Sequence, residues 1–111
     1  NDKVCVETPA EGWVALHDPG ARVFCALRVD RVVTSYIAVC TNHGWWPFTG
    51  RAGYWVALEP CTGFPDRLDE AVAAGRGRRI GPGGWVEWGM ELVVGSASHA
   101  GEVAERMAQP G

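Results

Sequence analysis

The strongest constraint on the fold is a strict alternation of apolar residues in the segment 84–94. One set of alternate positions is apolar throughout and comprises Val86, Trp88, Met90, Leu92 and Val94. The other set includes two glutamates and a glycine. Because successive side chains of a β-strand point to opposite sides, the first set shares one face. We therefore predict a long strand over residues 84–94, with its apolar face packed against a hydrophobic core.

Shorter runs of the same kind recur along the chain and are separated by turns that contain glycine or proline. The predicted strands cover residues 4–6, 13–16, 22–29, 32–41 (one strand or a pair), 54–59 and 84–94. Short helices are predicted at 66–74 and at 98–107, the second with Ser98 as N-cap and little apolar stripe. With 111 residues, of which 47% are hydrophobic, we expect one domain over 1–111. Its predicted fold class is all-β, an antiparallel β-sandwich with at most short surface and C-terminal helices.

The charge and hydropathy of the chain argue against several classes of function. The formal net charge is −3 and the pI is near 5.5. Proteins that bind nucleic acids or anionic membrane surfaces need clustered positive charge instead. No apolar run approaches the ~20 residues of a membrane span, and no signal-peptide pattern opens the chain. We therefore expect a cytoplasmic protein that binds neither nucleic acid nor membranes.

The cysteines and histidines do not form a ligand pattern. Cys5, Cys25, Cys40 and Cys61 are widely spaced, with no CxxC or Cys/His motif, and no histidine is paired at ligand spacing. We predict no metal site and no cofactor. Each cysteine lies in or beside an apolar run, so we interpret all four as reduced, buried thiols. Disulfides are the alternative, because four is an even number.

Two features are candidates for a functional site. Glu59 stands where a strand pattern gives way to a loop, and Pro60 fixes the backbone directly after it. It is either an ordinary charge at a strand edge or a carboxylate held in position. Trp45 and Trp46 lie in an aromatic loop, where they are either core residues or ligand contacts. Indole faces beside polar groups suit sugar rings, whose C–H faces pack on aromatic side chains.

Several short motifs follow one another in a fixed order in the second half of the chain. They are Ala57-Leu58-Glu59-Pro60, Phe64-Pro65-Asp66-Arg67-Leu68, Ile80-Gly81-Pro82-Gly83-Gly84 and a final strand that runs to Gly95. This order resembles the C-terminal part of the aldose 1-epimerases, which belong to the galactose mutarotase-like superfamily. The turn at residues 18–20 and the strand at 22–29 resemble the preceding hairpin of that family. The resemblance covers about residues 13–95 and leaves 96–111 as a C-terminal tail or short helix.

The resemblance implies a truncated supersandwich of the galactose mutarotase-like type. In that family the glutamate of the Leu-Glu motif is the general base that takes the proton from the anomeric hydroxyl, and its position matches Glu59. We expect Trp45, Trp46, Asp66 and Arg67 to be the substrate-binding residues. The histidine acid of the family lies upstream of the matching segment, and none of the three histidines here matches its motif.

Two interpretations of the function therefore stay open. The first is an aldose 1-epimerase-like carbohydrate-binding domain, an isomerase that anomerises a free or phosphorylated aldose with Glu59 as general base. The second is a non-catalytic β-sandwich that binds sugars or proteins and lacks the catalytic acid. Because a truncated sandwich exposes sheet edges and apolar surface, we also expect a homodimer or a larger assembly.

Overall fold

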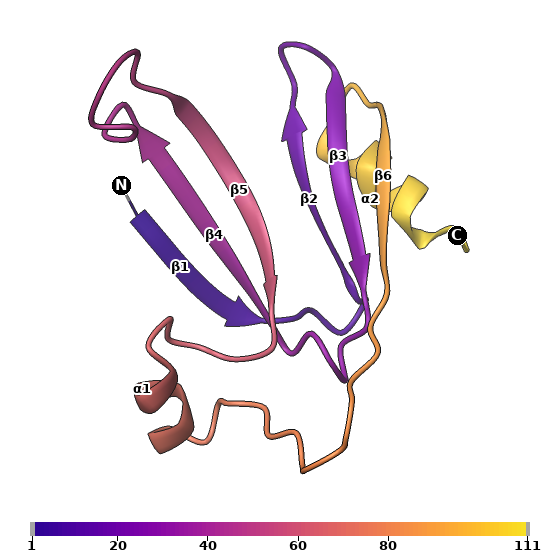
Figure 1. Ribbon diagram of the computed structural model, residues 1–111. Helices are drawn as coiled ribbons and strands as arrows, with labels where there is room; N and C mark the ends of the chain where they lie inside the picture. Colours follow the sequence, from indigo (N-terminus) through magenta and orange to yellow (C-terminus); the bar gives the residue numbers. More distant parts are fainter. Residues whose placement is uncertain (1, 111) are drawn as a thin grey trace.

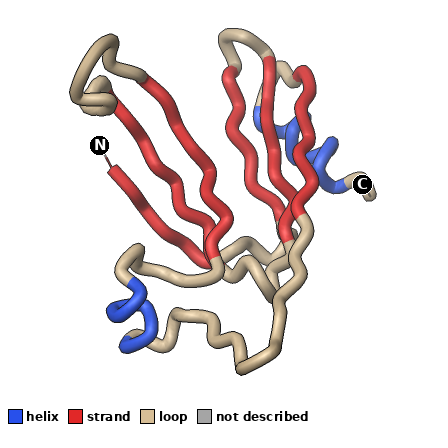
Figure 2. The backbone as a smooth tube through the Cα atoms, in the orientation of Figure 1, coloured by secondary structure: helices blue, strands red, loops and turns tan. Residues whose placement is uncertain are grey.

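The computed structural model describes residues 2–110, in which six strands and two helices occur (Figure 1; Figure 2). The strands are β1 (Asp2–Glu7), β2 (Trp13–Asp18), β3 (Val23–Val29), β4 (Tyr36–His43), β5 (Tyr54–Cys61) and β6 (Met90–Ser96). The helices are α1 (Leu68–Ala73) and α2 (Ala100–Ala108). Of these helices, neither is long or apolar enough to cross a bilayer.

The strands form two antiparallel sheets, which confirms the predicted all-β class. Sheet A has the strand order β1-β4-β5, and sheet B has the order β2-β3-β6. Figure 1 shows the sheets side by side and splayed apart, with α2 against sheet B and α1 below sheet A. The arrangement is sandwich-like in its two sheets, and its main hydrophobic core lies between sheet B and α2.

Sheet B buries one face under α2. The predicted alternation in β3 is confirmed, since Phe24 and Ala26 are buried in this core while Cys25, on the other face, is exposed. Val103 and Met107 of α2 complete the core, each only 3% exposed. These two residues are one helical turn apart and therefore point to the same side. The prediction of little apolar stripe was wrong, because two well-placed residues suffice to dock so short a helix.

The N-terminus of α2 also differs from the prediction. The N-cap is His99, whose Nδ1 accepts a hydrogen bond from the Glu102 amide, and not Ser98. Ser98 instead donates its backbone N–H to the Glu102 carboxylate, at 2.8 Å. The helix consequently starts at Ala100, close to the predicted boundary.

The prediction for the segment 84–94 was wrong in two respects. The strand β6 begins only at Met90, and Trp88, expected in the core, is 64% exposed. Leu92 and Val94 are exposed as well, whereas Val93 on the opposite face packs against the core under α2. The helix covers the face of β6 that carries Val93 and Gly95, where the glycine leaves room for the ring of Phe24. A Cβ at Gly95 would lie 2.9 Å from the ring of Phe24.

The strand predicted over 32–41 starts later, and the cysteines are less buried than expected. Asp30 organises a turn, in which its carbonyl accepts the Thr34 amide at 2.7 Å and its side chain accepts the Val32 amide at 2.9 Å. The backbone therefore becomes extended only from Tyr36. The four cysteines are free thiols, and none of them is fully buried, contrary to our expectation.

Met107→Ala should lower the free energy of unfolding by about 2–3 kcal/mol, because the truncation leaves a cavity between α2 and sheet B. Glu105→Ala, on the exposed side of the same helix, is the matched control and should change it by less than about 0.5 kcal/mol. Urea unfolding at one fixed chain concentration measures both effects. Equal effects of the two substitutions would contradict the packing of α2 on sheet B.

Candidate functional site

Glu59 lies inside β5 and not at its end, because the strand continues through Pro60 to Cys61. A proline is tolerated here since β5 is an edge strand of sheet A, where a missing N–H does not break the sheet. The register sets Glu59 opposite Ala38, which in turn is opposite Cys5. Its side chain therefore projects on the face of sheet A that also carries alternate residues of β1.

Lys3 joins two of the predicted site residues. Its Nζ lies 3.0 Å from Oε2 of Glu59 and 2.7 Å from Oδ1 of Asp66. Hydrogen bonds to Asp66 and to Glu59 favour the ammonium form and raise the pKa of Lys3 above its ordinary range. We call Lys3, Glu59 and Asp66 the carboxylate–lysine cluster. It is partly open to solvent, since the side chains of Lys3 and Glu59 are 35% and 41% exposed.

A hollow of about 380 Å³ opens beside the carboxylate–lysine cluster. Lys3 and Asp66 line it, together with Cys5, Phe64 and Arg67. Glu59 is not part of the lining and reaches the hollow through its ion pair with Lys3. The size of the hollow is within the range of pockets that bind small molecules.

The wall formed by Phe64 is held in place from two sides. Tyr36 contacts its ring edge-on, with centroids 4.9 Å apart, and the Arg76 guanidinium lies 4.4 Å from the ring centroid. One face of the Phe64 ring is therefore covered by a cation. These contacts fix the loop that carries Asp66 relative to sheet A.

The thiols of Cys5 and Cys40, which lie near the cluster, are not activated. Burial raises the pKa of the Cys5 thiol, and burial together with a hydrogen bond to Glu59 raises the pKa of the Cys40 thiol. A thiol with a raised pKa is protonated at neutral pH and is a poor nucleophile. Cys61 donates its S–H to the backbone carbonyl of Glu59, at 3.1 Å. Within residues 2–110, no group of three His, Cys, Asp or Glu side chains is placed to hold a metal ion.

Arg67 lines the hollow, but its charge is already paired. Its guanidinium lies 2.6 Å from the Asp69 carboxylate and 3.3 Å from that of Glu70, both in the first turn of α1. To contact a ligand as predicted, the Arg67 guanidinium has to bond the ligand and these two carboxylates at the same time.

The structure does not bring Trp45 and Trp46 to Glu59. They belong to the loop between β4 and β5, at the end of β5 that begins with Tyr54, about 17 Å along the strand from Glu59. The buried Asn42 amide holds this loop. Its nitrogen donates to the carbonyls of Trp46 and Gly53, and its oxygen accepts the backbone N–H groups of both tryptophans.

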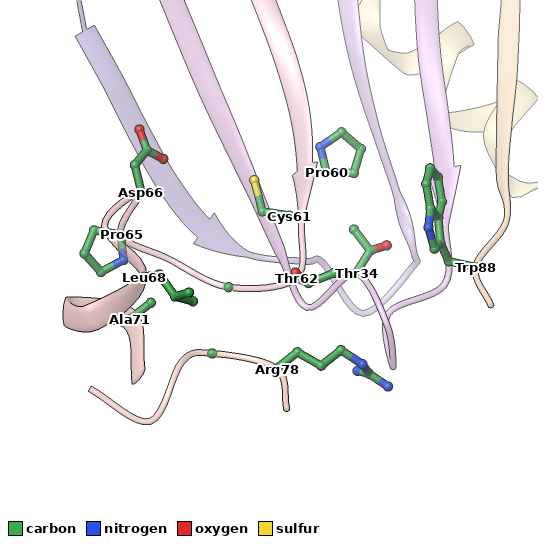
Figure 3. A pocket seen from close by; sticks show the side chains of 12 residues that line it. Thr34, Pro60, Cys61, Thr62, Pro65, Asp66, Leu68, Ala71, Arg78 and Trp88 are labelled. Carbon is green, nitrogen blue, oxygen red and sulfur yellow. The ribbon is translucent and has the colours of Figure 1, made fainter. Parts of the chain in front are cut away.

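A second hollow, of about 480 Å³, borders the loop that leads from β5 to α1 (Figure 3). Its lining includes Asp66, Thr62, Arg78 and Trp88, and Figure 3 shows Asp66 and Trp88 at opposite ends of it. Asp66 therefore borders both hollows. Sequence reasoning missed Trp88 because it assigned this residue to a strand face in the core. It also missed Lys3, although the alternation in β1 was the available signal.

Comparisons with models of known protein families, with curated proteins and with solved structures gave no match to this chain.

Lys3→Gln should lower the free energy of unfolding by about 0.5–1 kcal/mol at neutral pH, because Glu59 and Asp66 lose their shared cation. The folded pKa of Lys3 is raised above its ordinary value of 10.5. The contribution is therefore fully present below pH 10.5 and declines as the pH rises toward the folded pKa.

Urea unfolding of wild type and Lys3→Gln across neutral and alkaline pH measures this contribution. The difference between the two proteins should stay constant up to about pH 10 and shrink above it. A difference that grows with alkaline pH would contradict the ion-pair geometry.

Proposed function

We propose that the chain is a carbohydrate-binding domain whose ligand site is the carboxylate–lysine cluster with the hollow beside it. The proposal is carried by one observation, the convergence of two carboxylates on one ammonium at a hollow of small-ligand size. Carboxylate oxygens accept hydrogen bonds and the ammonium donates them, so the cluster offers both roles that neighbouring sugar hydroxyls need. Phe64 and Pro65 supply apolar surface for the C–H groups of the ring.

The expected ligand is a neutral, cyclic aldose. Asp66 and Glu70 line the hollow, and Glu59 lies next to it. The Arg67 guanidinium, which lines the hollow, is already paired with Asp69 and Glu70. These charges favour a free aldose over a phosphorylated one.

Anomerisation of the bound aldose is the second candidate function. The resemblance to the aldose 1-epimerases gives Glu59 the role of general base, and its partly exposed carboxylate is accessible to an anomeric hydroxyl. The reaction also needs an acid that protonates the ring oxygen. Lys3 is poorly suited to this role, since a raised pKa makes its ammonium a weaker acid. The described residues therefore support binding more strongly than catalysis.

Titration of the ¹⁵N-labelled chain with glucose and with galactose tests the proposal. We expect chemical-shift changes at the amides of Lys3, Cys5, Cys61 and Asp66, which line the hollow. Glu59→Gln and Asp66→Asn keep the side-chain shapes and should weaken binding by about tenfold each, since each removes a charged acceptor. Glu105→Gln on α2 is the control and should leave binding unchanged. Shifts that are absent, or that are confined to other surfaces, would contradict the proposed site.

Polarimetry of freshly dissolved α-glucose and α-galactose separates binding from anomerisation. Acceleration by the wild-type chain that Glu59→Gln abolishes would establish Glu59 as the base. If both proteins stay at the buffer rate while the titration shows binding, the chain binds sugars without anomerising them. If the titration also shows no binding, both candidate functions fail.

A further inference from the structure

The chain exposes more surface than a compact protein of its mass. Its accessible area is 7842 Å², whereas a folded monomer of 12.0 kDa exposes about 6,000 Å². Its radius of gyration is 16.2 Å, against about 13 Å for a compact domain of this length. The extents of 48 × 43 × 22 Å describe a broad, thin molecule. A surplus of about 1,800 Å² per chain therefore remains uncovered.

Part of the exposed surface is apolar and lies on one face of each sheet. On sheet B, the face away from α2 carries Val23, Met90, Leu92 and Val94, which are 46–65% exposed. On sheet A, the face away from the carboxylate–lysine cluster carries Val4, Val6 and Val56, which are 47–57% exposed. We call these seven residues the open apolar surface. Contiguous exposed apolar surface is typical of interaction sites.

The two faces adjoin one another. Val56 of sheet A lines one hollow of about 370 Å³ together with Leu16, Cys25 and Val94 of sheet B. The side chains on the two sheets therefore belong to one continuous surface that spans the splayed sheets of Figure 1. The alternation in β6 is typical of a strand with one buried apolar face, although a single chain leaves this face exposed.

We propose that a second copy of this chain covers the open apolar surface. If each copy buried its surplus, the interface would total about 3,600 Å², inside the range of about 2,000–5,000 Å² for obligate homodimers. A two-fold axis brings the same surface of both copies together, so this surface has to be complementary to itself. None of its seven residues is charged, and their opposition creates no repulsion between like charges. The carboxylate–lysine cluster lies on the other face of sheet A and stays accessible in this dimer.

Sedimentation velocity over a wide range of chain concentration tests the dimer. We expect the wild type to sediment at twice the chain mass of 12.0 kDa. The double variant Leu92→Lys/Val94→Lys should sediment as a monomer, because it opposes four ammonium groups across the two-fold axis. Val32→Lys/Val72→Lys is the matched control, since both residues are exposed outside the open apolar surface, and it should remain dimeric. A wild type that is monomeric at all concentrations overturns the proposal.

Alkylation of Cys25 keeps the proposal testable if the double variant fails to fold. Cys25 is exposed in the single chain and lies within the surface that the second copy would cover. Its labelling in the wild type, read by peptide mass spectrometry, should slow by about tenfold as the chain passes from monomer to dimer. A dimer in which Cys25 reacts as fast as in the monomer would place the interface elsewhere and overturn the proposal.

Discussion

The packing of α2 on one face of sheet B is the interaction on which the rest of the structure depends. Val103 and Met107 close over Phe24 and Ala26, and this contact holds together strands that are far apart in the sequence. It fixes β6 beside β3 and thereby turns the bulkier apolar residues of β6 toward the opposite side. The chain has no further helix on that side within residues 2–110, so this face of sheet B stays open.

Within the described residues, 2–110, sheet A has no comparable helix on either face, and its two faces differ in character. One face carries Val4, Val6 and Val56 and continues the open apolar surface. The other carries the carboxylate–lysine cluster, whose position depends on the register of β1, β4 and β5. Self-association through the apolar face and ligand binding on the polar face are therefore compatible within one molecule. This separation also makes the two proposals experimentally independent.

Local patterns in the sequence predicted much of the fold and only part of the site. The alternation of apolar residues located most strands and both faces of β3. It could do so because successive side chains of any β-strand point to opposite faces of the sheet. It could not show which face a helix covers, since that depends on contacts of β3 with Val103 and Met107, which lie far away in the sequence. Asp66 and Glu59 were predicted, but Lys3 contacts Asp66 across a sequence separation of 63 and needs three strands in register. Trp45 and Trp46 were predicted as substrate contacts from their aromatic loop, and that loop lies at the opposite end of β5 from Glu59.

The central claim is that the apolar faces of the two sheets are covered by a second copy while the carboxylate–lysine cluster stays open. An isotope-filtered NOE experiment on a mixture of ¹³C-labelled and unlabelled chains tests it most directly. We expect intermolecular NOEs to the methyl groups of Val23, Leu92 and Val94, and none to the half-buried Ala57 on the cluster face of sheet A. The absence of intermolecular NOEs, or contacts confined to the cluster face, would contradict it.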